Sequence, residues 1–327
     1  MQFRIALSSS LILSTAVLYG KYYRYMKKID NLEGKYVLII GCDSSIGFTT
    51  AKKLTNAGFK VIGTCLTENA EKTLQEEFSG YNFHVIRVDV NDMNSITDAK
   101  RVVLSLIDDQ SALWAIINNV GSMDKIGPFD WLKKDDYIRS LDINFYGHLN
   151  ILHTFLPLLK KSKGRIITNT TSEVTLPLPH LSPYCTSKMA LEGLIMSTRP
   201  ELGDFGIHSI DIQHGYIRTN MTFNMHEKWK KAWNESDHIS KTDYESKLLF
   251  HKKYENLKKF SQTSMPSFLL SSDDVANCYL KAVSRKYPKS VYYLGFYGKL
   301  VQFLRIFSPN NIIRKKFVRI LSNMDNS

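Results

Sequence analysis

The sequence predicts an α/β fold built on a doubly wound parallel sheet of about seven strands, with helices on both faces. Three observations lead to this prediction. From Leu32 onward, short runs rich in Val and Ile alternate with amphipathic segments of helical period. These runs lack the polar alternation of a half-exposed strand, as is typical of parallel strands buried on both faces. The first run ends in a glycine turn that leads directly into a helix, a common start for such a sheet.

The elements follow one another in a regular order. Strands are expected at Tyr36–Ile40, Lys60–Cys65, His84–Asp89, Trp114–Asn118, Arg165–Asn169, Ser209–Gln213 and Val291–Leu294. Amphipathic helices are expected between the first six strands, at Thr49–Asn56, Glu68–Phe78, Ile96–Ile107, Tyr137–Leu159 and Ser187–Leu202. The lysine-rich stretch 221–264 has few strand signals and is predicted to be an insertion that covers the substrate. We therefore expect one Rossmann-type domain over 32–295, between an N-terminal segment at 1–31 and an apolar, basic C-terminal segment at 296–327.

The charge distribution argues against nucleic acid as a partner. A formal net charge of +12 would suit a polyanion. However, the basic residues gather beside apolar stretches, at Lys21–Lys28 and Arg314–Arg319, and not in one aromatic-interleaved patch. This placement favours an anionic membrane surface. The segment 296–327 fits a core helix and a membrane-surface helix about equally well. The four cysteines have neither metal-ligand nor paired spacing, so no zinc site or disulfide framework is predicted.

The N-terminus is expected to be a membrane anchor. Ile5–Gly20 carries no charge, and its sixteen residues would span ~24 Å as a helix, close to the thickness of a bilayer core. The basic residues of Lys21–Lys28 would then keep the folded domain in the cytosol. A cleaved signal peptide is the alternative, because Ser14–Ala16 resembles a cleavage site.

Two turns of the predicted sheet suit a nucleotide. Gly41–Gly47 joins the first strand to a helix, so the backbone can approach a pyrophosphate that faces free N–H groups at the helix N-terminus. Asn118–Gly121 follows the fourth strand, where side-chain amides can brace a ribose. Taken alone, this second segment is more typical of a simple Asn–Gly turn.

The strongest local signal is the pair Tyr184 and Lys188. Four residues apart on a helix, the two side chains share one face. A nearby ammonium stabilises a phenolate, so we expect the pKa of the phenol to move down toward the working range of a general base. Ser172 lies twelve residues before the tyrosine, at the end of the fifth strand, where its hydroxyl could hold a substrate oxygen. A surface Tyr/Lys pair on an amphipathic helix would carry the same spacing.

In this order along the chain, the motifs resemble the short-chain dehydrogenase/reductase superfamily over residues 35–219. The resemblance implies hydride transfer between a nicotinamide cofactor and an alcohol or ketone, with Tyr184 as general acid/base. It implies a catalytic tetrad of Asn144, Ser172, Tyr184 and Lys188. The cofactor-binding residues that it implies are Gly41, Ser45, Ile46, Gly47, Asp89, Asn118, Gly121, Tyr184, Lys188 and Thr219.

Within the superfamily, the chain is most similar to the retinol dehydrogenase and hydroxysteroid dehydrogenase branch. The similarity rests on Gly41–Ser44, Cys65–Glu68, Leu113-Trp114 and Tyr184-Cys185. It implies a lipophilic small-molecule substrate and an enzyme anchored in the endoplasmic reticulum membrane, and it allows a homodimer. The cofactor it implies is NAD, with NADP as the alternative, because the second strand ends in neither an acidic nor a basic residue.

Four residues depart from the family pattern. Ile40 and Ser45 replace the usual threonine and second glycine of the nucleotide turn. Val120 replaces an alanine beside the cofactor, and His214 replaces a proline before Gly215. None of these changes removes a catalytic atom. They leave open a second interpretation, in which the chain is a weakly active or inactive membrane-bound lipid-binding or scaffold protein that retains the dehydrogenase fold.

Overall fold

The computed structural model describes residues 20, 23–107, 112–242, 244–263 and 269–307. Seven strands form one fully parallel sheet in the order β3-β2-β1-β4-β5-β6-β7. The strands are β1 (Lys35–Ile40), β2 (Lys60–Cys65), β3 (Phe83–Arg87), β4 (Ala112–Asn118), β5 (Arg165–Asn169), β6 (His208–His214) and β7 (Val291–Leu294). The predicted doubly wound sheet is confirmed. Its strand order reverses between β1 and β4, and ligands of such sheets bind outside the carboxyl ends of the strands at this point.

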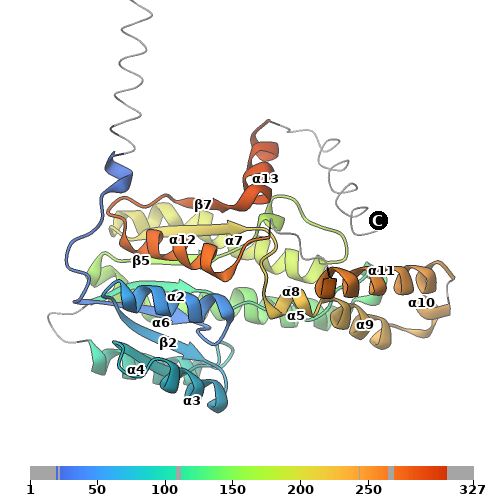
Figure 1. The fold of residues 1–327 in the computed structure, drawn as a ribbon, viewed down its shortest axis with the longest axis horizontal. Helices are drawn as coiled ribbons and strands as arrows, with labels where there is room; N and C mark the ends of the chain where they lie inside the picture. Colours follow the sequence, from blue (N-terminus) through green and yellow to red (C-terminus); the bar gives the residue numbers. More distant parts are fainter. Residues whose placement is uncertain (1–19, 21–22, 108–111, 243, 264–268, 308–327) are drawn as a thin grey trace, which may run out of the picture.

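Helices cover both faces of the sheet (Figure 1). Strand β1 explains why, because its side chains alternate between two cores. Val37 and Ile39 join the core under α2, α3 and α12, while Leu38 and Ile40 join the core under α4 and α6. These helices are α2 (Ser45–Asn56), α3 (Glu68–Glu77), α4 (Met93–Leu106), α6 (Gly147–Ser162) and α12 (Ser272–Ser284).

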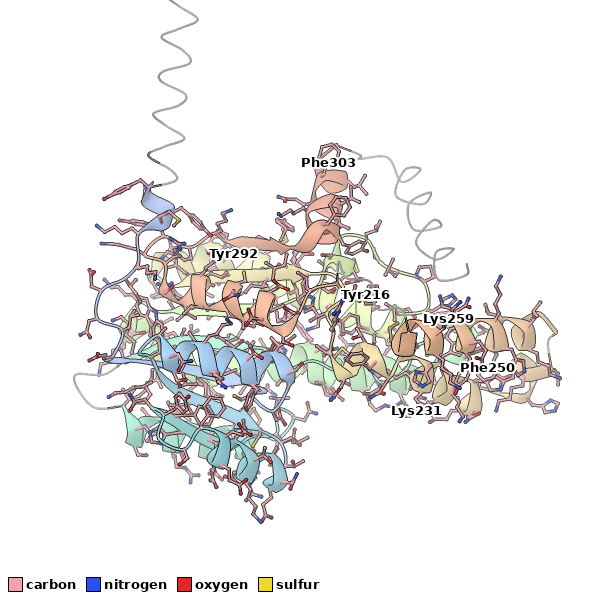
Figure 2. All side chains as sticks on the ribbon, in the orientation of Figure 1. Tyr216, Lys231, Phe250, Lys259, Tyr292 and Phe303 are labelled. Carbon is pink, nitrogen blue, oxygen red and sulfur yellow. The ribbon has the colours of Figure 1, made fainter. Side chains whose placement is uncertain are left out.

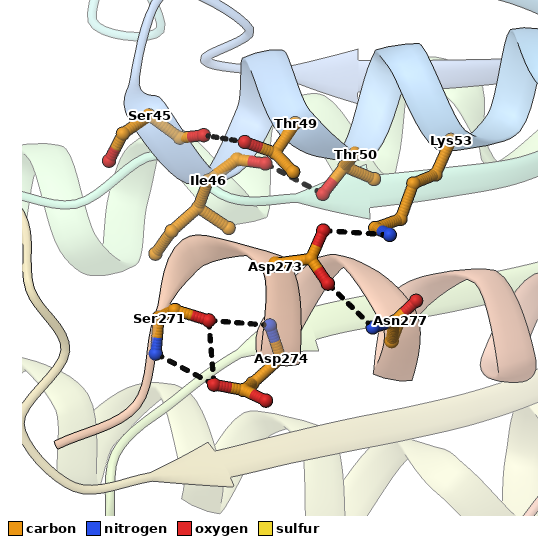
Figure 3. A network of polar contacts seen from close by, with 9 residues as sticks. All are labelled: Ser45, Ile46, Thr49, Thr50, Lys53, Ser271, Asp273, Asp274 and Asn277. Carbon is orange, nitrogen blue, oxygen red and sulfur yellow. Dashed lines mark hydrogen bonds and ion pairs between the residues drawn. The ribbon is translucent and has the colours of Figure 1, made fainter. Parts of the chain in front are cut away.

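Polar contacts fasten α2 to α12 along the outer side of one face. Figure 3 shows Lys53 of α2 paired with Asp273 of α12 at 2.7 Å, and Asp273 also accepts a hydrogen bond from Asn277. Ser271 caps α12 by a reciprocal capping box with Asp274. Helix α12 therefore holds the C-terminal half of the chain against the first strand–helix unit, which carries the glycine turn.

The predicted helix 137–159 is interrupted. Helix α5 (Lys134–Leu141) runs into a π turn, η2 (Asp142–Tyr146), before α6 begins. Such π turns inside helices are frequently found at functional sites. Two short 3₁₀ turns, η1 (Phe129–Trp131) and η3 (Ser172–Val174), follow β4 and β5. Helix α7 (Ser182–Asp204) carries both Tyr184 and Lys188.

The lysine-rich stretch after β6 folds into four helices that extend away from the sheet (Figure 1). They are α8 (Asn220–Phe223), α9 (Met225–Glu235), α10 (His238–Thr242) and α11 (Tyr244–Thr263). Aromatic side chains hold them to the domain: the ring of Trp131 lies 4.9 Å from Trp229 and 5.0 Å from Trp233. Phe250, labelled in Figure 2, stacks on Trp233. This aromatic cluster forms a third core, separate from the two that flank the sheet.

A buried ion network reinforces the same attachment. The Lys125 ammonium lies 2.7 Å from Asp136 of α5 and 2.5 Å from Glu235 of α9. Arg139 also pairs with Asp136. Buried charges are tolerated only when paired in this way. The network therefore links the segment after β4 to the far end of α9.

Both ends of the described chain lie beside β7 and α12. The residues around Lys28 pair with Arg285 at the end of α12. Helix α13 (Gly295–Phe307) exposes Phe296 and Phe303. In the ranges that the structure describes, the helices lack the combined length and apolarity needed to cross a bilayer. The expected anchor Ile5–Gly20 falls almost wholly outside those ranges, as does the end of the segment 296–327.

Candidate active site

The glycine turn after β1 is shaped by backbone constraints. Gly41 has a φ of +82°, and a Cβ there would lie 2.9 Å from the side chain of Val120. A Cβ on Gly47 would lie 2.1 Å from the carbonyl oxygen of Gly41, so only glycine fits. The Ser44 hydroxyl caps α2 by accepting a hydrogen bond from the Gly47 N–H at 3.1 Å. Asn119 donates from Nδ2 to the Gly41 carbonyl at 3.0 Å and fixes the turn from β4.

A cavity of about 480 Å³ lies at this turn, between the carboxyl ends of the strands. Its size and place match the general pattern of cofactor sites in open α/β sheets. Eight of the residues named from the sequence line it: Gly41, Ser45, Ile46, Asp89, Gly121, Tyr184, Lys188 and Thr219. The cavity therefore brings the nucleotide turn and the Tyr/Lys pair together in one space.

Four of the named residues do not line the cavity: Gly47, Asn118, Asn144 and Ser172. Gly47 lies directly behind the turn that it permits. The side chain of Asn118 is buried, and its amide has no hydrogen-bond partner among the described residues. The neighbouring Asn119 lines the cavity, and its amide donates to the Gly41 carbonyl and the Ser44 hydroxyl. The reason is the alternation of side chains along a strand, by which a one-residue difference reverses the direction of a side chain.

Asn144 acts on the site through the π turn. Its Oδ1 accepts from the Ser122 N–H at 2.7 Å, and its Nδ2 donates to the Ser122 carbonyl at 2.8 Å and to the Ser187 hydroxyl at 2.9 Å. A Cβ on Gly121 would lie 3.4 Å from Asn144 Oδ1 and 3.3 Å from Lys188 Nζ. Asn144 thus joins the loop after β4 to helix α7, next to the lysine.

Tyr184 and Lys188 lie together, but burial dominates their chemistry. The Lys188 ammonium lies 6.0 Å from the centre of the Tyr184 ring and donates to the Asn169 carbonyl at 2.9 Å. Burial lowers the pKa of Lys188 to about 8. Burial, and then the charge of Glu173, raise the pKa of the Tyr184 phenol above its usual value. The pKa of Tyr184 is thus raised and not lowered as expected, because burial dominates the shift.

Thr171 is a functional candidate that the sequence argument missed. Its side chain acts to lower the pKa of Tyr184, in opposition to burial. Thr171 lines the cavity just after β5, and its hydroxyl donates to the His214 carbonyl at 3.2 Å. By contrast, the Ser172 hydroxyl is buried without a partner in the described chain, and a Cβ on Gly298 of α13 would lie 3.3 Å from it. The run Thr170-Thr171-Ser172 holds three adjacent hydroxyls: that of Thr170 bonds to buried Asp211, and that of Thr171 caps the turn η3.

Two further cavity-lining residues, Glu173 and His214, were not assigned a role from the sequence. Glu173 is 3% exposed, and burial raises the pKa of its carboxyl to about 7. Burial lowers the pKa of His214 to about 4, so its ring is neutral. His214 Nδ1 donates to the Gly215 carbonyl at 2.7 Å, since a carbonyl can only accept. The sequence signal for Glu173 was a single charged residue in the otherwise uncharged stretch that follows the fifth strand.

The sheet order, the glycine turn and the shared Tyr/Lys cavity define a dinucleotide-binding oxidoreductase. A family model of the short chain dehydrogenases matches residues 35–230, and the chain belongs to that family, in the branch of the retinol and hydroxysteroid dehydrogenases. Three relatives support this placement. The human short-chain dehydrogenase/reductase family 9C member 7 is 31% identical and covers 85% of this chain and 88% of its own. Human 17-beta-hydroxysteroid dehydrogenase type 6 is 30% identical over 85% and 86% of the two chains. Rat (Rattus norvegicus) retinol dehydrogenase 7 is 31% identical over the same shares.

Solved structures support the fold. A short chain dehydrogenase from Burkholderia cenocepacia in complex with NADP superposes with a TM-score of 0.64 and 16% sequence identity. It covers 85% of this chain and 95% of its own. At this identity the likeness concerns the fold, which is the Rossmann-like fold of the family.

Proposed function

We propose that this protein is an NAD(H)-dependent dehydrogenase of lipophilic alcohols, with Tyr184 as general acid/base. One observation carries the proposal: a single cavity contains the glycine turn, Tyr184 and Lys188. A pyrophosphate at Gly41 would face the N-terminus of α2, and the absence of a side chain at Gly47 permits the tight turn that leads into this helix. These residues fit a nicotinamide dinucleotide. When bound, this cofactor supplies the hydride acceptor or donor.

The residues around Tyr184 supply the proton chemistry. In oxidation, the phenol oxygen takes the proton of the substrate hydroxyl, and in reduction it returns the proton. Lys188 places a positive charge beside the phenol, and Asn144 keeps the loop at Gly121 in contact with that ammonium. The resemblance assigned the orienting hydroxyl to Ser172. The contact of Thr171 with the phenol supports a share of this role for Thr171.

The preference for NAD over NADP rests on Asp43. This exposed residue lines the cavity, and its carboxylate accepts a hydrogen bond from the Leu66 N–H at 3.4 Å, at the end of β2. A cofactor ribose is expected at this strand end. The carboxylate would accept hydrogen bonds from ribose hydroxyls and repel an additional phosphate. NADP is therefore expected to bind more weakly.

The substrate class follows from the names of the relatives and from the surface. The relatives are a 17-beta-hydroxysteroid dehydrogenase and a retinol dehydrogenase, so a hydroxysteroid or a retinoid is proposed here. Phe296 and Phe303 of α13 are exposed, as is Tyr23 near the start of the described chain. Helix α13 projects from the same side of the domain as that start (Figure 1). An apolar surface of this kind beside a basic segment suits a membrane, and the endoplasmic reticulum is the proposed location.

A substrate panel tests the proposal. Membranes from cells that express the full chain are assayed with retinoids and hydroxysteroids, using NAD and NADP in parallel. We expect turnover with NAD to exceed turnover with NADP for at least one of these lipid classes. Titration of the purified protein with NADH, followed by cofactor fluorescence, is expected to saturate. Absence of both turnover and saturable binding would contradict the proposal and favour a scaffold role.

The membrane proposal has its own test. After washing with alkaline carbonate, the full chain is expected to stay in the pellet with microsomal membranes. Release of the protein into the supernatant would argue against an integral anchor.

A further inference from the structure

Glu173 is a buried carboxyl at the reacting end of the cavity. It lies in η3, directly after Thr171 and Ser172, and lines the same cavity as Tyr184. Its charge also raises the pKa of Tyr184, second only to burial. The salt bridges of the described chain do not include Glu173. Burial of a carboxyl without a positively charged partner costs free energy. A hydrogen-bonding group of a bound ligand would offset part of this cost.

The Glu173 carboxyl accepts a hydrogen bond from its own backbone N–H, which leaves further lone pairs on its two oxygens. His214 presents a second acceptor to the same cavity. Because Nδ1 donates to the Gly215 carbonyl and the ring is neutral, Nε2 carries a lone pair. This Nε2 is buried and has no hydrogen-bond partner among the residues described. The bond from Thr171 to the His214 carbonyl joins the end of β6 to the turn that carries Glu173. Two acceptors therefore belong to residues that line the cavity with Tyr184, and a ligand that satisfies them must donate hydrogen bonds.

Among ligand groups that can donate to Glu173 and His214, a neutral hydroxyl fits the cavity best. An ammonium would also bind a carboxylate, but the cavity already contains the buried Lys188 ammonium. A second cation in this low-dielectric space would be repelled by Lys188. A hydroxyl can donate to either acceptor without adding charge, and it can also accept from Glu173 when that carboxyl is protonated.

We propose that Glu173 and His214 form a subsite for a second hydroxyl of the substrate, so that the preferred substrates are lipophilic diols. This inference rests on the proposed function, since it places the first hydroxyl on Tyr184. Glu173 is then a specificity-determining residue. It discriminates against mono-alcohols, because a bound mono-alcohol has no second hydroxyl to bond the buried Glu173 carboxyl.

The test uses matched pairs of alcohols on one skeleton. One pair is a long-chain secondary alkanol and its 1,2-diol, and the other is a 3-hydroxysteroid and its 3,17-dihydroxy analogue. For the full-length protein with NAD, we expect kcat/KM for the preferred diol to exceed that of its mono-alcohol by about tenfold or more. Glu173→Leu is expected to reduce this ratio to near one, and Glu173→Gln, which keeps a hydrogen-bonding group, to an intermediate value. Glu76→Gln, on an exposed face of α3, is the matched control and should leave the ratio unchanged.

A binding measurement separates this inference from the proposed function. Thermal stabilisation of the NADH-saturated protein is recorded with each alcohol, and the diol is expected to stabilise more than the mono-alcohol only when Glu173 is present. If no alcohol is oxidised but this difference is observed, the proposed function fails and the subsite stands. Equal stabilisation of the wild-type protein by both members of each pair, or an unchanged ratio in Glu173→Leu with intact NADH binding, would overturn the subsite. A matched amino alcohol that is preferred over the diol would overturn the assignment of a hydroxyl.

Discussion

The two sides of the cavity are built differently. On the cofactor side, the polar groups of the glycine turn bond to one another: Ser44 caps α2 and donates to Gly41, and Asn119 bonds to both. On the substrate side, Ser172 Oγ and His214 Nε2 are buried without partners within the described ranges. The glycine turn is therefore braced before any ligand binds. The substrate side has unused hydrogen-bonding capacity at these two atoms, which is typical of a surface shaped for a ligand.

The largest expected effect lies where the two sides meet. Tyr184→Phe removes the one oxygen proposed to carry the proton, so turnover is expected to fall by about 10²–10⁴-fold. Because the glycine turn is unchanged, NADH affinity should stay within about threefold. Steady-state kinetics and NADH fluorescence titration measure the two quantities.

Tyr146→Phe is the matched control, since this tyrosine is half exposed at the end of the π turn. It should leave both values unchanged. If Tyr184→Phe turned over at a rate near that of the wild-type protein, Tyr184 would not be the general acid/base. The proposed division of the cavity into two sides would then lose its support.

The aromatic cluster attaches the inserted helices to the domain and forms a core apart from the sheet. Trp229 is fully buried against Trp131, and its indole N–H donates to the Phe250 carbonyl. Trp229→Ala is expected to lower the free energy of unfolding by about 3–5 kcal/mol. The KM for alcohol should rise, while NADH affinity changes little, because this core lies apart from the two that flank the sheet.

Urea unfolding and NADH titration check this prediction. Phe129→Ala removes an aromatic ring that is 78% exposed and should change neither quantity. An equal loss of NADH affinity and alcohol affinity in Trp229→Ala would mean that the insertion and the sheet do not act as separate regions.

Sequence reasoning succeeded where the signals are local. The Val and Ile runs, the glycine turn and the Tyr184/Lys188 spacing each lie within a few residues, and the sheet and most of the cavity lining follow from them. It failed where the direction of a side chain depends on a shift of one residue, or where a pKa depends on contacts with distant segments. Asn119 faces the cavity in place of Asn118 for the first reason. The raised pKa of Tyr184 belongs to the second, because burial depends on segments that are distant in the sequence.

Glu173 makes the stability of the substrate side sensitive to pH. Its pKa is about 7 in the folded protein, against 4.5 when exposed, so unfolding releases a proton between these two values. The free energy of unfolding should therefore fall as the pH rises from 4.5 to 7, by about 3 kcal/mol in total at 1.4 kcal/mol per pH unit. The groups that face Glu173 and titrate far above this window are Tyr184 and Cys185 of α7 and Tyr297 of α13.

Glu173→Gln removes this titration. The variant is expected to be more stable than the wild-type protein at pH 8 by up to about 3 kcal/mol, with no such gain at pH 4. Urea unfolding at the two pH values measures the difference. A gain of equal size at both pH values would show that packing, and not ionisation, is responsible.

The smallest expected effect concerns the two adjacent hydroxyls of η3. Thr171→Val keeps the shape of the side chain and removes the hydroxyl that contacts Tyr184, while Ser172→Ala removes the hydroxyl beneath Gly298. The loss of kcat/KM should be about tenfold larger for Thr171→Val than for Ser172→Ala, because one hydrogen bond of ordinary strength contributes about this factor. The pH dependence of kcat should also shift upward in Thr171→Val alone, because the bond from Thr171 lowers the pKa of the phenol. A larger loss in Ser172→Ala would return the orienting role to Ser172. It would also require the start of α13 to move away from Ser172 during turnover, since Gly298 lies against that hydroxyl.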